Sequence, residues 1–172
     1  MKYSFALLST AALLAAAPAI AADAPNDAQI AHIAYTAGTI DVAAGKQALA
    51  KSKNKAIRDF AQEMVRDHTA VNDKALALVK KLHVTPQDNP TSQALTKAAD
   101  TERAKLAKMS GAAFDREYIN NEVAYHKTVN GALEKTLIPS AKNAELKSLL
   151  QTGLKLFEEH QAHAEKVAKE LK

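Results

Sequence analysis

The 172-residue chain contains no cysteine and no tryptophan, and only five glycines and five prolines. Without cysteine it can form no disulfide, thiolate nucleophile or cysteine-bound lipid anchor. Aromatic residues make up only 5% of the chain, although hydrophobic residues make up 47%. Few aromatic residues, few chain breakers and many alanines and leucines favour helices over a sheet. We therefore expect an all-α protein.

Signatures of several function classes are also missing. The chain has no glycine-rich phosphate loop and no G-x-S-x-G nucleophile elbow. The net charge of +4 is spread along the chain, and no block of consecutive Lys and Arg residues marks a nucleic-acid surface. We therefore expect no nucleic-acid partner and assign no catalytic residue. A binding role is favoured over an enzymatic one.

Residues 1–21 have the pattern of a secretory signal peptide. Lys2 supplies the positive region, and the apolar run at 5–17 is shorter than a membrane-spanning helix. A small-x-small site ends at Ala21, and the polar Asp23 follows. We predict a signal peptide that is removed during export.

Cleavage is predicted after Ala21, with Ala22 as the alternative, which leaves one mature domain at residues 22–172. No other stretch of the chain is long and apolar enough to cross a membrane. We expect a periplasmic protein, with association with the cell envelope as the alternative. A homo-oligomer or an envelope protein remains open as a partner.

Helical periodicity predicts four long helices and one shorter helix in the mature chain. Asn26 or Asp27 is expected to cap the first helix, and Thr91 or Ser92 the third. The predicted breaks are polar, glycine-containing or proline-containing segments. The predicted helices cover residues 27–50, 54–82, 92–109, 112–137 and 141–172, and the last break is Ile138-Pro139-Ser140.

The lengths of the connections predict the topology. Short connections make the first two long helices antiparallel neighbours, and the last two likewise. The middle connection takes about thirty residues and contains the shorter helix. This is the pattern of a ferritin-like four-helix bundle with one long helical crossover. An up-down-up-down bundle with a fifth packed helix is the alternative.

Three histidines interrupt the apolar faces of these helices at a similar depth. His68 falls where the segment MVRDHTAV should place its next core residue. His68 and His126 each lie fourteen residues past the predicted start of their helix, and His160 lies twelve residues before the chain end. In the predicted topology this difference is only about 3 Å. The three imidazoles are therefore expected in one layer.

Acidic residues and a fourth histidine fall near this layer. Glu122 precedes His126 by four residues, so the two share a helix face. Imidazole binds Zn, Fe or Cu, and carboxylate adds affinity for Fe or Mn. The predicted metal ligands are His68, Glu122, His126 and His160, with Asp41, Glu63 and His163 as further candidates and Asp67 and Glu159 as residues that orient the rings.

Two other interpretations of the layer stay open. A metal-free network of hydrogen bonds between histidines and carboxylates would set the register of the helices in a structural or interaction module. A di-metal oxidase is less favoured, because the candidate residues lack the Glu-x-x-His spacing of di-iron bundles. Glu122 and His126, like Glu159 and His163, are one residue further apart.

Three segments together resemble a bacterial family known as domain of unknown function 4142. They are FAQEMVRDH at 60–68, FDREYINNEVAYH at 114–126 and LFEEHQAHAEKV at 156–167. The resemblance extends from about Asp27 to Val167. It implies an exported, ferritin-like helical protein, of a kind often labelled as outer-membrane proteins. The positions that match the pattern are Asp67, His68, Phe114, Asp115, Tyr118, His126 and His160.

The chain departs from the family pattern at two places. The acidic residue late in the first helix is Asp41, where Glu is usual. The segment Val-Ala-Tyr-His ends at His126, where Val-x-Asp-His is commoner, which weakens a paired-carboxylate site on that helix. The family has no established activity, so the resemblance implies a fold and a compartment but no reaction.

Overall fold

The computed structural model describes residues 24–171, so the predicted signal peptide lies outside the described residues. The described chain is all-α, as predicted, and contains no strand. A π-helical turn, Leu133–Leu137, and the short α5, Ile138–Ser140, continue the fourth long helix. The five long helices are α1 (Asp27–Lys51), α2 (Lys55–Lys81), α3 (Pro90–Ala107), α4 (Gly111–Ala132) and α6 (Ala144–Glu170).

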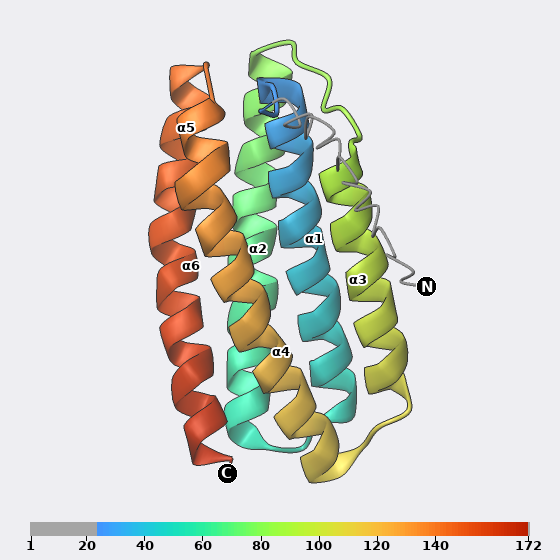
Figure 1. The fold of residues 1–172 in the computed structure, drawn as a ribbon. Helices are drawn as coiled ribbons and strands as arrows, with labels where there is room; N and C mark the ends of the chain where they lie inside the picture. Colours follow the sequence, from blue (N-terminus) through green and yellow to red (C-terminus); the bar gives the residue numbers. More distant parts are fainter. Residues whose placement is uncertain (1–23, 172) are drawn as a thin grey trace, which may run out of the picture.

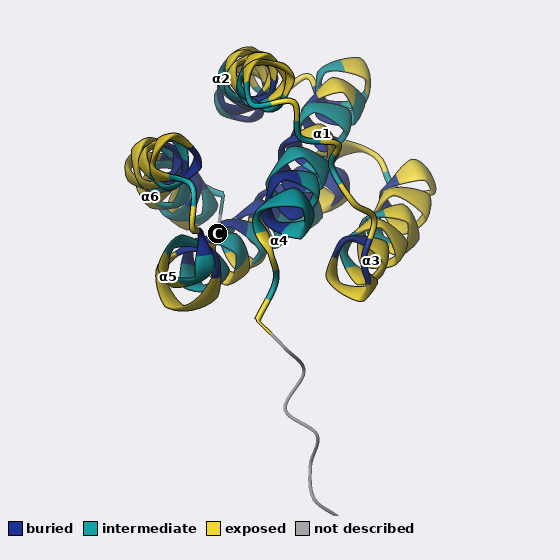
Figure 2. Cartoon of the chain, turned by 90° about the horizontal axis from the view of Figure 1, so that it is seen from above, coloured by how far each residue is buried: buried dark blue, intermediate teal, exposed yellow. Residues whose placement is uncertain are grey.

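Four of these helices surround a common core, and α3 packs on the outside against α1 (Figures 1 and 2). The pairs α1–α2 and α4–α6 are antiparallel neighbours joined by short connections (Figure 1). The segment that carries α3 returns the chain to the end where α2 began. Consequently α2 and α4 run in the same direction (Figure 1).

The buried residues form two apolar clusters, one toward each end of the four helices. The lower cluster in Figure 1 is rich in large side chains, including Phe60, Phe114 and Tyr118. The upper cluster is largely aliphatic, with Leu133 and Leu150 among its members. A layer of buried polar residues separates the two clusters along every one of the four helices.

The cap of α3 differs from the prediction. Asn89, and not Thr91 or Ser92, is the N-cap residue, and its side chain accepts a hydrogen bond from the backbone N–H of Ser92 at 3.0 Å. Pro90 then occupies the first helical position, where its fixed φ suits the helix and its missing N–H costs nothing. Asn26, one of the two residues predicted to cap the first helix, is the N-cap of α1 and forms a capping box with Gln29.

The predicted break at residues 138–140 is also wrong, because this segment is helical. The N–H of Ile138 bonds to the carbonyl of Leu133, which widens the helix by one residue just before Pro139. A proline removes one donor and crowds the preceding turn, and a π-helical turn accommodates both effects. The helix ends instead at Ser140, and the next residue, Ala141, has an extended backbone.

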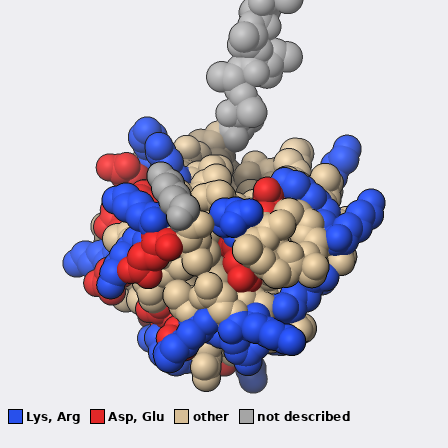
Figure 3. All heavy atoms as spheres, turned by 90° about the horizontal axis from the view of Figure 1, so that it is seen from below, with Lys and Arg blue, Asp and Glu red and all other residues tan. Residues whose placement is uncertain are grey.

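The surface carries charges of both signs. The face seen from below shows many basic side chains around its rim, with acidic side chains among them (Figure 3). Ion pairs such as Lys55–Asp59 and Lys81–Glu145 lie on exposed helix faces. Within residues 24–171, no helix combines the length and the apolar character that crossing a membrane requires.

Candidate metal centre

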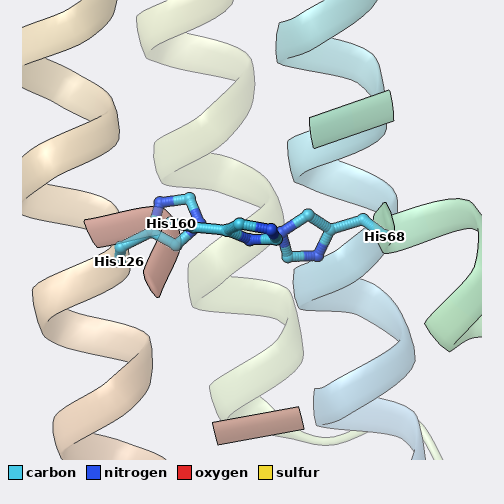
Figure 4. A group of neighbouring side chains, drawn as sticks. All are labelled: His68, His126 and His160. Atoms are coloured by element: carbon cyan, nitrogen blue, oxygen red, sulfur yellow. The ribbon is translucent and has the colours of Figure 1, made fainter. Parts of the chain in front are cut away.

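The structure brings His68, His126 and His160 together in the polar layer. They come from α2, α4 and α6, and their rings point toward one another at one level of the core (Figure 4). The ring centroids are 5.2 to 5.7 Å apart, and each side chain is at most 2% exposed. One ring nitrogen from each residue lies within 4.8 Å of the others. The three imidazoles are close enough to share one ion.

Hydrogen bonds hold two of these rings in a defined tautomer. Nδ1 of His126 lies 3.0 Å from the backbone carbonyl of Glu122. Because a carbonyl can only accept, Nδ1 must carry the proton, and Nε2 keeps its lone pair. Nε2 of His160 donates in the same way to Asp67 at 3.1 Å, which leaves Nδ1 with a lone pair. Each ring therefore offers one nitrogen to a cation.

Two buried carboxyl groups complete the layer. Glu122 precedes His126 by one turn of α4 and is 1% exposed, with Oε2 at 3.6 Å from Nδ1 of His126. Asp41 from α1 is 3% exposed, with Oδ2 at 3.5 Å from Nε2 of His68. Together with His126 these carboxyl groups form a second set of donors within 4.8 Å of one another. All four core helices therefore contribute a donor.

Burial sets the protonation state of the imidazoles. It lowers the pKa of His68 well below its usual value, and repulsion from the other two histidines adds to this effect. Burial also lowers the pKa of His126 to about 4, and lowers that of His160 although the Asp67 hydrogen bond opposes it. All three rings are consequently neutral near pH 7. Neutral imidazole is the form that binds metals.

Burial acts in the opposite direction on the carboxyl groups, because it favours the protonated form. It raises the pKa of Glu122 to about 8. The pKa of Asp41 is raised well above its usual value, first by burial and then by the nearby Glu122 carboxyl. A cation in the layer would favour the ionised forms and release these protons.

Within residues 24–171, six polar atoms of the layer are buried and form no hydrogen bond. Buried donors and acceptors are almost always paired in folded proteins, because each unpaired group costs about 1 to 3 kcal/mol. Here the unpaired atoms are concentrated on residues that face one another. They are both ring nitrogens of His68, Nε2 of His126, Nδ1 of His160, Oδ1 of Asp41 and Oε2 of Glu122.

The remaining predicted residues lie at the edge of the layer, between α2 and α6. Asp67 accepts a hydrogen bond from the His160 ring and another from the exposed Arg66. Glu63 and His163 bond to each other at 2.6 Å and are 30% and 38% exposed. Glu159 is exposed, and within the described chain it makes no hydrogen bond to a histidine.

Sequence reasoning underrated two residues. Asp41 is only a further candidate from the sequence, where it is the one acidic residue of α1 near the predicted layer, yet it lies as deep as Glu122. Phe157 is the second of these residues. Its ring stacks on His68 with centroids 4.6 Å apart and an interplanar angle of 16°. Its position one turn before His160 on the same face was the available signal.

The comparisons with known proteins identify the family. A family model described as a domain of unknown function (DUF4142) matches residues 11–167, so the chain belongs to that family, as its resemblance predicted. No curated protein and no solved structure matches the chain.

Proposed function

We propose that this DUF4142 protein is an exported, ferritin-like four-helix bundle that binds a transition-metal ion at its centre. The proposed ligands are His68, His126, His160 and Glu122, and Asp41 joins them from α1. The parallel course of α2 and α4, with α3 in the long crossover between them, supports the ferritin-like assignment. The proposed role is metal handling or protection under stress, without turnover of a substrate.

The unpaired buried atoms are the observation that carries the proposal. Without a cation, four desolvated nitrogens of the three histidines have no hydrogen-bond partner within the described residues. One cation would satisfy several of them at once, because the free lone pairs of the three histidines meet in one place. Nitrogens bound to the same tetrahedral ion lie about 3.3 Å apart, given bonds near 2 Å. Shifts of about 1.5 Å or less would bring the present atoms to that distance.

The donor set suits a borderline metal. Three neutral imidazoles favour Zn, Fe or Cu, and the carboxyl groups of Glu122 and Asp41 add affinity for Fe or Mn. Asp67 supports the site from outside, since a carboxylate bonded to the far nitrogen of a ligating histidine fixes its ring. Ionisation of the two carboxyl groups would also neutralise a divalent charge within the core.

A metal-free structural module is the second candidate function. The bonds of His126 to Glu122 and of His160 to Asp67 favour it, because they already form part of a polar network. His68 weighs against it, since within the described residues neither of its ring nitrogens forms a hydrogen bond, although Oδ2 of Asp41 lies 3.5 Å from Nε2. A network that served only to fix helix register would be expected to satisfy its central member.

Elemental analysis tests the proposal. The purified protein is stripped with a chelator, loaded with Fe²⁺, Zn²⁺, Mn²⁺ or Cu²⁺ in turn, and freed of excess metal. We expect about one ion per chain for at least one metal, and strongly reduced retention in His68→Ala, His126→Ala and His160→Ala. His32→Ala is the matched control, because His32 lies against Asp88 away from the layer.

Two outcomes would contradict metal binding. One is that the unaltered protein retains none of the four metals. The other is that the three layer variants retain as much metal as His32→Ala while their helix content remains intact. Export is tested separately by the mass of the protein recovered from the periplasmic fraction. A chain that begins at residue 22 or 23 is expected, and an intact N-terminus in the cytoplasm would contradict export.

A further inference from the structure

A second site lies in the upper half of the core, beside the polar layer. It is a pocket of about 340 Å³ between the α1–α2 pair and the α4–α6 pair. The pocket runs from buried Gly153 and Phe157 to the exposed Thr91 and Thr128. Its volume is about twice that of a roughly 150 Å³ apolar cavity that holds a benzene molecule, and it falls in the usual range of ligand pockets.

Small side chains create the pocket. Four of the five α1 residues that line it are small, namely Ala31, Ala34, Ala37 and Gly38 beside Ile33, and α6 contributes Gly153. Because these side chains are short, they leave space between α1 and the α4–α6 pair, except at Gly38, where the Asn72 side chain occupies the position that a Cβ would take. In the lower half of the core the large side chains of Phe60, Phe114 and Tyr118 are fully buried. The pocket in the upper half of the core therefore follows from the small residues that the sequence places there.

The chemistry of the lining defines what can bind. Among the described residues that line it, none is charged or a histidine, and the polar ones are Asn72 and three threonines. A charged ligand would lose its hydration without gaining an opposite charge. Water inside the pocket would find few hydrogen-bond partners on this lining. A neutral molecule of mostly hydrocarbon character matches both the volume and the lining.

We propose that this pocket binds a small neutral, hydrocarbon-rich molecule. The inner end of the ligand lies against Phe157, whose ring separates the pocket from His68 by stacking on it. The outer end lies near the threonines, where a single hydroxyl or carbonyl group of the ligand finds hydrogen-bond partners. Binding in the pocket involves none of the proposed metal ligands, so this proposal does not depend on the metal centre.

The test uses N-phenylnaphthylamine, a neutral dye whose emission rises in apolar surroundings. We expect saturable binding at about one dye per chain. Gly153→Leu should weaken it at least tenfold, because the new side chain enters the space that the dye would fill. Gly131→Leu is the matched control. A Cβ at Gly131 meets nothing within 4 Å, and Gly131 does not line this pocket.

A second blocking variant, Ala37→Leu, fills the pocket from the opposite wall and covers the case in which Gly153→Leu fails to fold. Circular dichroism confirms the helix content of each protein. Dye binding that does not saturate, or that persists unchanged in both folded blocking variants, would overturn the proposal. Competition defines the class: decanol should displace the dye well, and equal displacement by decanoate would overturn the assignment to a neutral ligand.

Discussion

Replacing Glu122 by glutamine should change how the stability of the metal-free protein depends on pH. The Glu122 side chain is 1% exposed, and burial raises its pKa from 4.5 to about 8. Near neutral pH the folded protein therefore retains a proton that the unfolded chain has released. This contribution to stability is fully present below about pH 4.5 and is lost as the pH rises through about 8.

The magnitude follows from proton linkage. One proton changes the free energy of unfolding by about 1.4 kcal/mol per pH unit. Between about pH 7 and about pH 8.5 the folded Glu122 carboxyl group itself begins to ionise, so the loss over this interval is roughly 1 kcal/mol. Glutamine has nearly the same size and does not titrate. The unaltered protein should consequently lose roughly 1 kcal/mol more stability than Glu122→Gln across this interval.

Urea denaturation followed by circular dichroism, with a chelator present, measures this difference. Both proteins carry the Asp41→Asn substitution in this comparison, because the Glu122 carboxyl also raises the pKa of Asp41 and the two titrations are coupled. Adding Zn²⁺ in excess should abolish the loss in the unaltered protein, because a bound cation keeps the carboxylate ionised in the folded state. Stability curves that run parallel in the two metal-free proteins would refute the raised pKa and the buried position from which it follows.

Three further predictions concern the layer and the helices around it. Burial lowers the pKa of His126 to about 4, so the unfolded chain takes up a proton on this histidine at a higher pH than the folded protein does. With a chelator present, the unaltered protein should therefore lose about 2 kcal/mol more stability than His126→Gln between about pH 6.5 and about pH 4.5. Urea titrations at the two pH values measure this difference. Gly45→Ala should lower the free energy of unfolding by about 1 to 3 kcal/mol, because a Cβ there would lie 2.9 Å from the carbonyl oxygen of Ala61. Gly131→Ala should raise the free energy of unfolding by up to about 1 kcal/mol, because a Cβ at Gly131 meets open space. Thermal unfolding compares the two variants. Asn54→Ala should cost about 1 kcal/mol in the same assay, because the Asn54 side chain caps α2 by accepting from two backbone N–H groups.

The helices were predictable because local signals determine them. Apolar residues at helical spacing, an asparagine cap and short polar interruptions placed every long helix without knowledge of the tertiary fold. The helix boundaries that were predicted wrongly lie where two local sequence signals compete. At Asn89-Pro90 the proline at the first helical turn outweighs the later Thr and Ser caps. At Pro139 a π-helical turn absorbs a residue that ordinarily ends a helix.

The convergence of the histidines was predictable for a different reason. Depth along a straight helix depends only on residue count and direction, so His68, His126 and His160 could be placed in one layer from the topology alone. Counting cannot supply the rotation of each helix about its axis. That rotation brings Asp41 into the layer and turns Glu159 outward. It also places Phe157 flat against His68, which depends on how α2 and α6 pack.

The polar layer lowers the stability that the core could otherwise reach. It divides the core into two apolar clusters and replaces four would-be core side chains by His68, His126, His160 and Glu122. Apolar residues of similar volume would pack the same space without leaving donors and acceptors unpaired. The lower cluster contains residues of α2, α4 and α6, so these three helices pack against one another directly beside the layer. Buried polar groups that lower stability but lie close together are expected in a binding site, because a bound ligand stabilises the folded protein by pairing with them.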